Sequence, residues 1–377
     1  MIYVTYHSTA EDVRVCSPAA NTKVETIAEA LERNGINVEI ISTCQRATVQ
    51  GPIPSRTYKL GKLVRCLQTP FYSSNSRLIR ILQNIFCNLF LFFFLLVYAK
   101  KNEIVLFYHA IERGFAVIFA KRLKGFKLLL EVEEVYADAL PLSPRQKKIE
   151  NKLFSCADAF IFSSSLLDEQ INKFRKPSAI VHGTYKVVAQ TCQKFNDGKI
   201  HILYAGTLDM RKGGAKAAVE TAGMLPENYH IHILGFGKEQ EIELIKSLID
   251  EVNALNCASV SYDGCLAGEA FTNFAQKCHI GLSTQNPNDV FNASSFPSKI
   301  LSYLANGLQV ISAKIPAVEH SKVGDIVHYY SQQTPQEISR AIRSVKVESK
   351  DKGRERIIFL HDEFINNISI LISSIKL

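Results

Sequence analysis

The sequence predicts an α/β protein with two doubly wound domains. Short apolar runs alternate with amphipathic stretches along nearly all of its 377 residues, a pattern typical of β-α-β units around a parallel sheet. A polar stretch without periodicity, residues 187–199, separates two series of such units and is expected to be a linker. We therefore expect one domain at 1–188, a second at 189–350, and a C-terminal helix at 351–377 that packs back on the first domain.

The expected strands form two series, each of which suits one parallel sheet. The first series comprises residues 2–6, 38–42, 104–108, 127–132, 159–163 and 179–182, with a helix at 23–34. The second comprises residues 200–205, 229–234, 259–262, 280–283 and 310–311, followed by a mostly helical tail at 354–377. In open parallel sheets, ligands bind beyond the carboxyl ends of the strands, so functional residues are expected there.

The composition is that of an ordinary globular protein. The nine cysteines are scattered and never form a C-x-x-C pair, which indicates reduced thiols, with no disulfide framework and no zinc site. The N-terminal residues lack a basic segment followed by an apolar one, which argues against export.

The net charge of +8 is unevenly distributed. Residues 1–190 carry a net charge of +9 and residues 191–377 a net charge of −1, and residues 40–130 contain 14 basic but only 2 acidic side chains. A basic surface of this size indicates an anionic partner, such as nucleic acid, acidic lipid or a phosphorylated substrate. The basic side chains are not interleaved with aromatic ones as in a base-stacking platform, so we do not expect nucleic acid to be the partner.

A long apolar run lies inside this basic region. Residues 81–99, ILQNIFCNLFLFFFLLVYA, are flanked by Arg77 and Arg80 and by Lys100 and Lys101. Polar residues interrupt the run and a predicted strand follows almost at once, so a membrane-spanning helix is not favoured. Two explanations remain. The run is either a helix that covers a sheet, or a helix that lies in a membrane interface with its basic flanks against anionic headgroups.

Residues 201–214, HILYAGTLDMRKGG, combine a strand, a turn and the start of a helix. The turn contains Arg211 and Lys212, and this arrangement suits a phosphate group, although neither a P-loop nor a dinucleotide-binding fingerprint is present. A solvated pair of basic side chains is the alternative. Gly235 follows the next strand in a similar turn.

Residues 296–312, FPSKILSYLANGLQVIS, predict a short helix with Pro297 at its first position, a stop at Gly307 and then a strand. The backbone N–H groups of such a helix start, beside Ser295 and Lys299, can bind an anion, although an ordinary capped helix also explains the segment. Because three strand-end loops are predicted at one edge of the second sheet, we expect a bound diphosphate there.

Several of these segments together resemble a known family. "YAGTLDMRKGG", "HILGFG", "VSYDGCLAGEAFTNFAQKCHIGLS" and "FPSKILSYLANGLQVIS" occur in the order and spacing of the nucleotide-binding domain of GT-B glycosyltransferases. They are most similar to family 4 and its bacterial polysaccharide-assembly members. "SPAANTKVETIAEALERNGINVEIIS" also looks like the first β-α-β unit of those enzymes. The resemblance implies a GT-B fold, with two Rossmann-like domains that face a central cleft.

For the donor, the resemblance implies that Lys212 contacts the diphosphate. Thr207 stands where the family often has an arginine, so Arg211 or Lys299 is expected to supply the second cation. The implied donor-binding residues are Gly206, Thr207, Arg211, Lys212, Gly235, Ser295, Pro297, Ser298, Lys299 and Ser302.

One part of the family pattern is missing. Ser294 and Ser302 occupy the two positions of the E-x7-E motif, whose carboxylates hold the donor ribose in the family. The absence of both glutamates leaves open how the ribose is bound, and it allows a catalytically degenerate member.

The first domain of the family holds the acceptor. Glu133 and Glu134 follow a predicted strand where many relatives carry a histidine, and only one of two adjacent carboxylates can face a given side. His109 is a second candidate at a strand end, and surface or structural roles are the alternatives. The candidate catalytic residues are thus Glu133, Glu134, His109 and Lys212, and the candidate acceptor-side loop contains Ser17, Pro18 and Asn21.

The expected function is transfer of a sugar from a UDP- or GDP-sugar to a lipid-linked saccharide, in the assembly of a surface polysaccharide such as O-antigen or capsule. We expect it to occur at the cytoplasmic face of the cell membrane, with retention of anomeric configuration and with neither a metal nor another cofactor. A catalytically degenerate GT-B subunit that organises a partner and a nucleotide-sugar epimerase are the alternatives.

Overall fold

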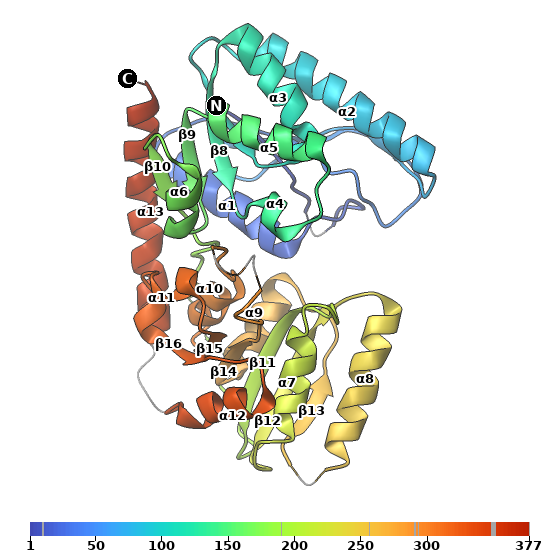
Figure 1. Cartoon of the computed structure of the whole chain (residues 1–377), viewed down its shortest axis with the longest axis vertical. Coiled ribbons are helices and arrows are strands. Elements are labelled where there is room, and N and C mark those ends of the chain that lie inside the picture. The colour runs from blue at the N-terminus through green and yellow to red at the C-terminus, as the bar shows by residue number, and fades with distance from the viewer. Residues whose placement is uncertain are drawn as a thin grey trace. The chain divides into compact units, whose positions relative to one another are not determined.

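The computed structural model describes residues 1–9, 11–189, 191–255, 257–289, 292, 294–347 and 352–376. The chain divides into two compact units (Figure 1). Unit 1 comprises Met1–Thr184 and Asp362–Leu377, and unit 2 comprises Tyr185–His361. The sequence predicted a first domain boundary between residues 188 and 189, and the two units divide between residues 184 and 185. The second predicted boundary, between residues 350 and 351, lies outside the described residues.

Unit 1 is built on one large sheet. Its strand order is β10-β9-β8-β7-β1-β2-β5-β4, and every pairing is parallel except that of β4 with β5. The strands are β1 (Ile2–Thr5), β2 (Val38–Ser42), β4 (Arg56–Lys59), β5 (Val64–Gln68), β7 (Ile104–Tyr108), β8 (Lys127–Val132), β9 (Ala159–Phe162) and β10 (Ser178–Ile180). Strands β3 (Gly51–Ile53) and β6 (Phe71–Ser73) form a separate antiparallel pair.

Helices surround this sheet. They are α1 (Pro18–Arg33), α2 (Arg77–Tyr98), α3 (Ile111–Lys124), α4 (Tyr136–Ala139), α5 (Pro144–Cys156) and α6 (Ser165–Ile171). Local sequence explains their ends. Pro18 lies in the first turn of α1, Ser143 and Gln146 form a capping box at α5, and Gly125 ends α3 with a left-handed φ of 68°.

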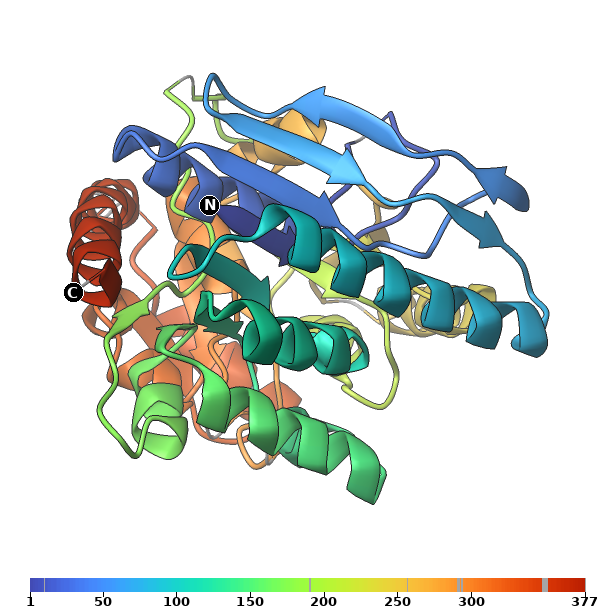
Figure 2. The ribbon, with the colours of Figure 1, turned by 90° about the horizontal axis from the view of Figure 1, so that it is seen from above.

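The core of unit 1 lies between the sheet and three of these helices. Leu91 and Leu95 of α2, Val117 of α3 and Leu153 of α5 pack with one face of the central strands. Figure 2 shows α2, the long blue-teal helix, running alongside α3. Because strand side chains alternate between faces, Tyr3 of β1 points away from this core cluster, to which its neighbours Ile2 and Val4 belong.

Unit 2 contains the second parallel sheet. Its strand order is β13-β12-β11-β14-β15-β16. The strands are β11 (Ile200–Thr207), β12 (Tyr229–Phe236), β13 (Ser259–Tyr262), β14 (Ile280–Ser283), β15 (Gln309–Ala313) and β16 (Val327–Tyr330). The helices are α7 (Gly214–Ala222), α8 (Glu239–Asn253), α9 (Gly268–Lys277), α10 (Lys299–Ala305), α11 (Pro316–Glu319), the 3-10 turn η2 (Gly324–Ile326) and α12 (Pro335–Ser344).

Helix α13 (Gly353–Lys376) belongs to both units. Its residues from Asp362 onward are part of unit 1, where Phe364, Ile368 and Leu371 are buried. The side chain of Asn34, at the end of α1, donates a hydrogen bond to the Ile365 carbonyl oxygen over 2.9 Å.

The helix that was expected to begin at Pro297 differs in one respect from the prediction. Helix α10 begins at Lys299, with Ser298 as its N-cap, so Pro297 precedes the helix and is not its first residue. Asn306 ends the helix and Gly307 follows with a φ of 74°, as the sequence indicated.

Candidate functional site

The order of strands in unit 2 defines where a ligand is expected. From β11 the chain moves outward through β12 and β13, then crosses to the other side of β11 at β14. A crevice forms at such a switch point, outside the carboxyl ends of the two strands. Gly206 and Thr207 end β11 at this edge, and Thr284 follows β14 there.

Lys299 is a cation that lies beside this point. Its Nζ lies 4.3 Å from the ring centroid of Tyr204, and a Cβ placed on Gly206 would be 2.9 Å from the same Nζ. In the described part of the chain, no carboxylate lies within ion-pair distance of Lys299. Burial, reinforced by the positive charge of Lys212, lowers the pKa of Lys299 to about 8. The ammonium is therefore held in a place that favours a bound anion.

Lys212 lies in the turn between β11 and α7. Its side chain is exposed, and its carbonyl oxygen accepts a hydrogen bond of 3.4 Å from Gln333. The next residue, Gly213, is the N-cap of α7 and has a φ of 63°, a conformation that favours glycine. The positive charge of Lys212 is close enough to contribute to the lowered pKa of Lys299.

The start of α7 is fixed against the end of β14. Thr284 Oγ1 donates a 2.6 Å hydrogen bond to the Gly214 carbonyl oxygen. A Cβ on Gly214 would lie 2.6 Å from the Thr284 carbonyl oxygen and 2.9 Å from the Tyr204 hydroxyl. Because only glycine fits at this contact, the start of α7 packs closely against the end of β14. This packing sets the position of the turn that carries Lys212, two residues before Gly214.

Arg211 is engaged in a different contact. Its guanidinium forms an ion pair with Asp209 over 2.8 Å, and its side chain is 90% exposed. The hydrogen bond from Arg211 also lowers the pKa of Asp209 to about 2. Of the two cations that the sequence left open, Lys299 and not Arg211 lies beside Gly206.

Gly235 has a packing role. A Cβ there would be 2.0 Å from the carbonyl oxygen of Gly206, which the neighbouring strand end holds in place. Its own carbonyl oxygen accepts a 3.1 Å hydrogen bond from Tyr262. The two glycines thus allow β11 and β12 to approach closely at the edge of the sheet.

The remaining donor candidates lie on and before α10. Pro297 is buried, Ser298 is exposed, and Ser302 is half-buried one turn into the helix. Ser294 and Ser295 are half-buried in the segment before them. A role for these residues in donor binding stays a prediction.

In unit 1, Glu133 and Glu134 follow β8 and do not lie within it. Glu133 forms an ion pair of 2.9 Å with Lys23, whose side chain is only 5% exposed. Burial alone would lower the pKa of Lys23, but the carboxylates of Glu133 and Glu131 outweigh it and raise that pKa. Glu133 thus helps to hold Lys23 in its charged form, and Glu134 beside Glu133 is half-buried.

His109 is buried between aromatic side chains. Its ring lies 4.9 Å from those of Tyr136 and Phe154, and its Nε2 is 3.3 Å from Glu150 Oε1. Glu150 in turn accepts hydrogen bonds from the backbone N–H groups of Tyr136 and Ala137, at the start of α4. These contacts join α4 and α5, and a catalytic role for His109 stays a prediction.

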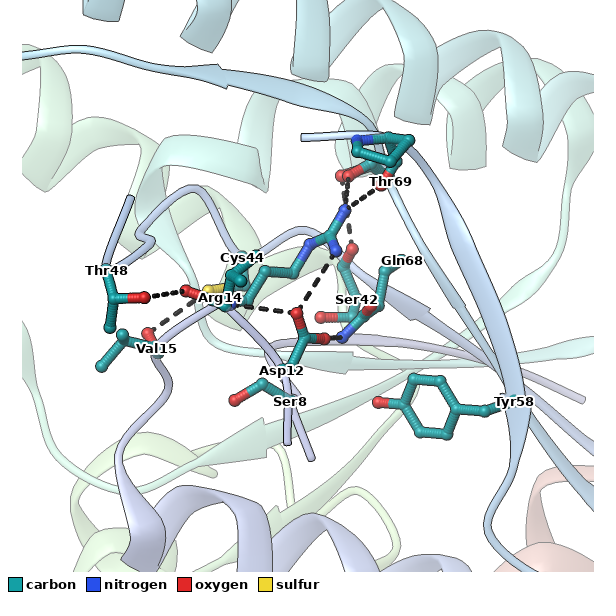
Figure 3. A network of polar contacts seen from close by, with 12 residues as sticks. Ser8, Asp12, Arg14, Val15, Ser42, Cys44, Thr48, Tyr58, Gln68 and Thr69 are labelled. Carbon is teal, nitrogen blue, oxygen red and sulfur yellow. Dashed lines mark hydrogen bonds and ion pairs between the residues drawn. The ribbon is translucent and has the colours of Figure 1, made fainter. Parts of the chain in front are cut away.

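The acceptor-side loop is fixed to the end of β1. The side-chain amide of Asn21 exchanges two hydrogen bonds with the backbone of Ser8, of 3.2 and 2.8 Å. Ser17 and Pro18 are exposed at the start of α1. The segment before them is anchored by Arg14, which Figure 3 shows reaching toward Thr69.

Sequence reasoning missed a buried charged group beside Glu133. Glu131 Oε2 accepts a 2.5 Å hydrogen bond from Tyr3, and Glu131 Oε1 lies 3.5 Å from Lys23. Burial raises the pKa of Glu131, while Lys23 opposes this shift. The inward position of Glu131 could have been found from strand alternation, since Leu129 and Glu131 point to the same face of β8.

Metal-ligating side chains do not cluster in the described residues. No three His, Cys, Asp or Glu side chains among them converge closely enough to hold a metal ion. All nine cysteines are free thiols.

No protein-family model matches this chain. No curated protein matches it either. Solved structures do resemble it. The E. coli structure described as trehalose-6-phosphate bound with UDP-2-fluoro glucose has a TM-score of 0.69 at 10% identity, over 99% of each chain.

Two further structures are similar over similar lengths. The α,α-trehalose 6-phosphate synthase of Burkholderia multivorans has a TM-score of 0.64 at 10% identity, over 99% of this chain and 95% of its own. Anabaena HepE in complex with UDP has a TM-score of 0.61 at 10% identity, over 99% of this chain and 98% of its own.

The chain has a GT-B fold. Its two parallel sheets are the two Rossmann-like halves of that fold, as the sequence predicted. At 10% identity the likeness lies in the arrangement of strands and helices. The chemistry of this GT-B chain must accordingly be argued from its own side chains.

Proposed function

We propose that this chain is a glycosyltransferase that moves a sugar from a nucleotide-diphosphate sugar to a saccharide acceptor. The observation that carries the proposal is the ammonium of Lys299. It lies at the switch point of unit 2, near the charge of Lys212 and without a carboxylate partner in the described residues. Two like charges that face one region are stabilised when an anion binds between them, and a diphosphate carries enough charge for both.

The nature of the donor is supported by the structural neighbours. Two of them hold UDP or UDP-2-fluoro glucose, so a UDP-sugar is the first choice for this chain, with a GDP-sugar as the alternative. The bond that breaks joins the anomeric carbon to the diphosphate. Catalysis therefore needs stabilisation of the negative charge that develops on the leaving group, and Lys212 and Lys299 would supply it.

The proposed reaction retains the anomeric configuration and uses no protein nucleophile. A trehalose-6-phosphate synthase among the structural neighbours was studied for glycosyltransfer with retention, which supports this choice. The two lysines would provide the charge neutralisation without a metal. The proton of the acceptor hydroxyl would pass to Glu133, to Glu134 or His109 as alternatives, or to the departing phosphate.

We place the acceptor on unit 1, at the carboxyl edge between β1 and β7. The rings of Tyr6 and Tyr108 meet edge to face there, with centroids 5.8 Å apart, and the Tyr108 and Tyr136 hydroxyls are 3.0 Å apart. Aromatic rings with polar ends suit a saccharide, which presents apolar C–H faces and hydroxyls. Burial raises the pKa of Tyr108 well above its ordinary value, and the negative charge of Glu133 acts in the same direction.

We further propose that the acceptor is lipid-linked, in the assembly of a surface polysaccharide such as O-antigen or capsule, at the inner face of the cell membrane. Helix α2 supports this. It is the one described helix long and apolar enough to cross a membrane, yet only 22% of its most apolar window is buried. A soluble helix normally exposes a polar face, whereas α2 exposes an apolar one.

The exposed apolar face extends over two adjacent helices. We call this set the α2–α3 face: Leu78, Ile81, Leu82, Ile85, Phe86, Leu89, Phe93, Val97 and Tyr98 of α2, with Phe115, Phe119 and Leu123 of α3. Five exposed basic side chains adjoin it: Arg77, Arg80, Lys100, Lys101 and Arg122. The sequence has no acidic residue from 76 to 102. An apolar face with basic ends matches the interface of an anionic bilayer.

Donor binding and turnover test the main proposal. Isothermal titration with UDP, and transfer from UDP-sugars and GDP-sugars to saccharide acceptors, would be measured for the natural chain and for Lys212→Ala and Lys299→Met. Each variant is expected to lose ~10–100-fold in affinity, because a charged hydrogen bond contributes ~1.5–3 kcal/mol. Lys216→Met removes a lysine that pairs with Glu220 on the same helix, and it should leave affinity unchanged.

The same measurements separate the alternatives. Binding of UDP that depends on both lysines, without turnover on any donor, would favour a catalytically degenerate subunit, which the serines at 294 and 302 allow. Conversion of the sugar without an acceptor would favour an epimerase. Unchanged UDP affinity in both lysine variants would overturn the proposed donor site.

A further inference from the structure

Two cysteines far apart in the sequence lie together in unit 1. The segments that contain them pair in antiparallel fashion. Arg14 and Ala47 form a bridge, Val15 N–H donates to the Arg46 carbonyl oxygen over 3.0 Å, and Thr48 N–H donates to the Val13 carbonyl oxygen over 2.8 Å. Cys16 and Cys44 continue these segments, and each thiol is close enough to shift the pKa of the other.

The Cys44 side of this pair is held firmly. Its Sγ is 3.4 Å from the Val15 carbonyl oxygen and 3.7 Å from that of Arg46, and Figure 3 shows Cys44 beside Val15. Cys44 is only 5% exposed. The thiol therefore points at the segment that carries Cys16.

The Cys16 side is anchored as well. Its backbone N–H donates to Ser8 Oγ over 3.2 Å. Two residues earlier, the buried Arg14 donates hydrogen bonds from Nη2 to the carbonyl oxygens of Pro54 and Thr69, over 2.6 and 3.1 Å. Both segments are therefore fixed close together, as a bond between the two sulfur atoms requires.

The local charges favour a thiolate. The hydrogen bond from Cys16 lowers the pKa of Cys44 to about 7, and the Arg14 and Arg46 cations act in the same direction, although burial opposes it. The contact with Cys44 raises the pKa of Cys16. At neutral pH, the pair therefore combines one reactive thiolate with one neighbouring thiol, which is the usual arrangement of a redox-active pair.

We propose that Cys16 and Cys44 are a reversible redox pair that a peroxide converts into an intramolecular disulfide. The Cys44 thiolate attacks one peroxide oxygen, the O–O bond breaks, and a sulfenic acid forms on Cys44 while the other oxygen leaves as water or alcohol after taking a proton. The Cys16 sulfur then attacks the Cys44 sulfur and displaces hydroxide, which the Cys16 proton converts to water. Overall, two thiols are oxidised and one peroxide is reduced.

The disulfide would join the residue just before α1 to the segment just after β2. Both lie at the carboxyl edge of the unit 1 sheet, and Cys16 adjoins the predicted acceptor-side loop. The bond would close the chain between these positions and restrict the residues just before α1. The inference does not depend on the proposed function, since it concerns only the chemistry of the two thiols.

Peroxide treatment of the full chain tests the pair directly. The natural protein would be exposed to hydrogen peroxide, alkylated while folded and again after unfolding, digested and analysed by mass spectrometry. We expect a linked peptide pair that contains Cys16 and Cys44, is lighter by two hydrogen atoms than the two free peptides, and disappears on reduction. The rate of its formation should rise about tenfold from pH 6 to pH 8, as the thiolate forms.

Two variants complete the test. Cys44→Ser should leave Cys16 without an intramolecular partner, whereas Cys265→Ser, at an exposed cysteine, should leave the linked peptide unchanged. The measurement on the natural protein needs no variant, so a folding defect in Cys44→Ser cannot hide the result. Oxidation of other cysteines while Cys16 and Cys44 both remain free to alkylate would overturn the proposal.

Discussion

The ammonium of Lys299 lies over the face of Tyr204, 4.3 Å from the centre of its ring, at the switch point of the unit 2 sheet. The aromatic face attracts a cation, but burial and the charge of Lys212 lower the pKa of Lys299 to about 8. The affinity of the switch point for a phosphate group should consequently depend on pH, on the presence of glycine at position 206 and on Lys299.

The affinity for UDP should fall above pH 8. A bound diphosphate stabilises the charged form of Lys299, so binding at higher pH must also take up a proton, and affinity should fall by up to about tenfold per pH unit. Titration calorimetry from pH 7 to pH 9.5, in buffers of different ionisation enthalpy, would measure both the affinity and the proton uptake. Lys299→Met should remove the proton uptake, and an unchanged uptake in that variant would assign it to another group.

The same substitution should stabilise the free protein. Because the folded-state pKa of Lys299 is depressed, the folded state disfavours the charged form, and this cost is present below pH 8 and disappears as pH rises toward the ordinary lysine pKa. Lys299→Met is thus expected to raise the free energy of unfolding by about 1–3 kcal/mol at pH 7. Thermal unfolding would show the gain, and UDP should then stabilise the variant less than the natural chain.

Alanine substitutions at two glycines should have different effects, one on UDP binding and the other on stability. At Gly206 the new Cβ would meet the mobile end of Lys299 at 2.9 Å, so Gly206→Ala should displace the ammonium and weaken UDP binding about tenfold, with little loss of stability. At Gly235 it would meet a fixed carbonyl oxygen at 2.0 Å, so Gly235→Ala should lower the melting temperature. Gly223→Ala, with an ordinary contact of 3.5 Å, is the control. A loss of UDP affinity in Gly223→Ala equal to that in Gly206→Ala would contradict this explanation.

The proposed membrane contact of the α2–α3 face can be tested by substituting one exposed leucine in each unit. Leu89 on α2 and Leu244 on α8 are 51% and 55% exposed, so aspartate at either position should have a similarly small effect on stability. Only Leu89→Asp should reduce flotation with vesicles that contain anionic lipid, because it places a carboxylate in the proposed contact with the bilayer. Binding should also weaken with salt and with Lys100→Glu. Equal flotation of both aspartate variants would refute the membrane contact.

Unit 2 should lose stability in mild acid through His230. Burial, reinforced by the neighbouring His232 and His201, lowers the pKa of His230 to about 4, and its two ring nitrogens contact Ser259 and Ser261 at 2.7 and 2.9 Å. A histidine with a depressed folded-state pKa destabilises the fold as pH falls from about 6.5 toward 4, since the unfolded chain is protonated first. His230→Asn should make the melting temperature less dependent on pH in this window. An identical pH profile would indicate that other groups control acid unfolding.

Much of the fold follows from local sequence. The strands at 104–108, 127–132 and 280–283 have the predicted bounds, because each is built on a short apolar run between turn signals. Strands β3 to β6, between residues 51 and 73, were not expected. β4 is exposed and charged, and β5 alternates buried positions with an exposed arginine, so neither presents the continuous apolar run of a buried parallel strand.

The candidate site could be predicted only in part. Gly206, Lys212 and Lys299 follow from strand-end loops and from the family resemblance. The ring of Tyr204 beneath Lys299 could not be predicted, because the two residues are far apart in the sequence and local patterns do not report such contacts. The ion pair of Arg211 with Asp209 could have been predicted, since the two residues are neighbours in one turn. A charge pattern alone, however, does not show whether an arginine pairs with a nearby carboxylate or binds a ligand.

The division of the chain has a consequence for the order of folding during synthesis. Unit 1 is completed by residues from Asp362 onward, which the ribosome adds only after all of unit 2. Unit 2 is contiguous in sequence and can fold as soon as it emerges, whereas the N-terminal part of unit 1 lacks, until later, the segment that carries the buried Phe364, Ile368 and Leu371. Until then the exposed α2–α3 face belongs to an incomplete unit, whose apolar surface makes the nascent chain prone to aggregation.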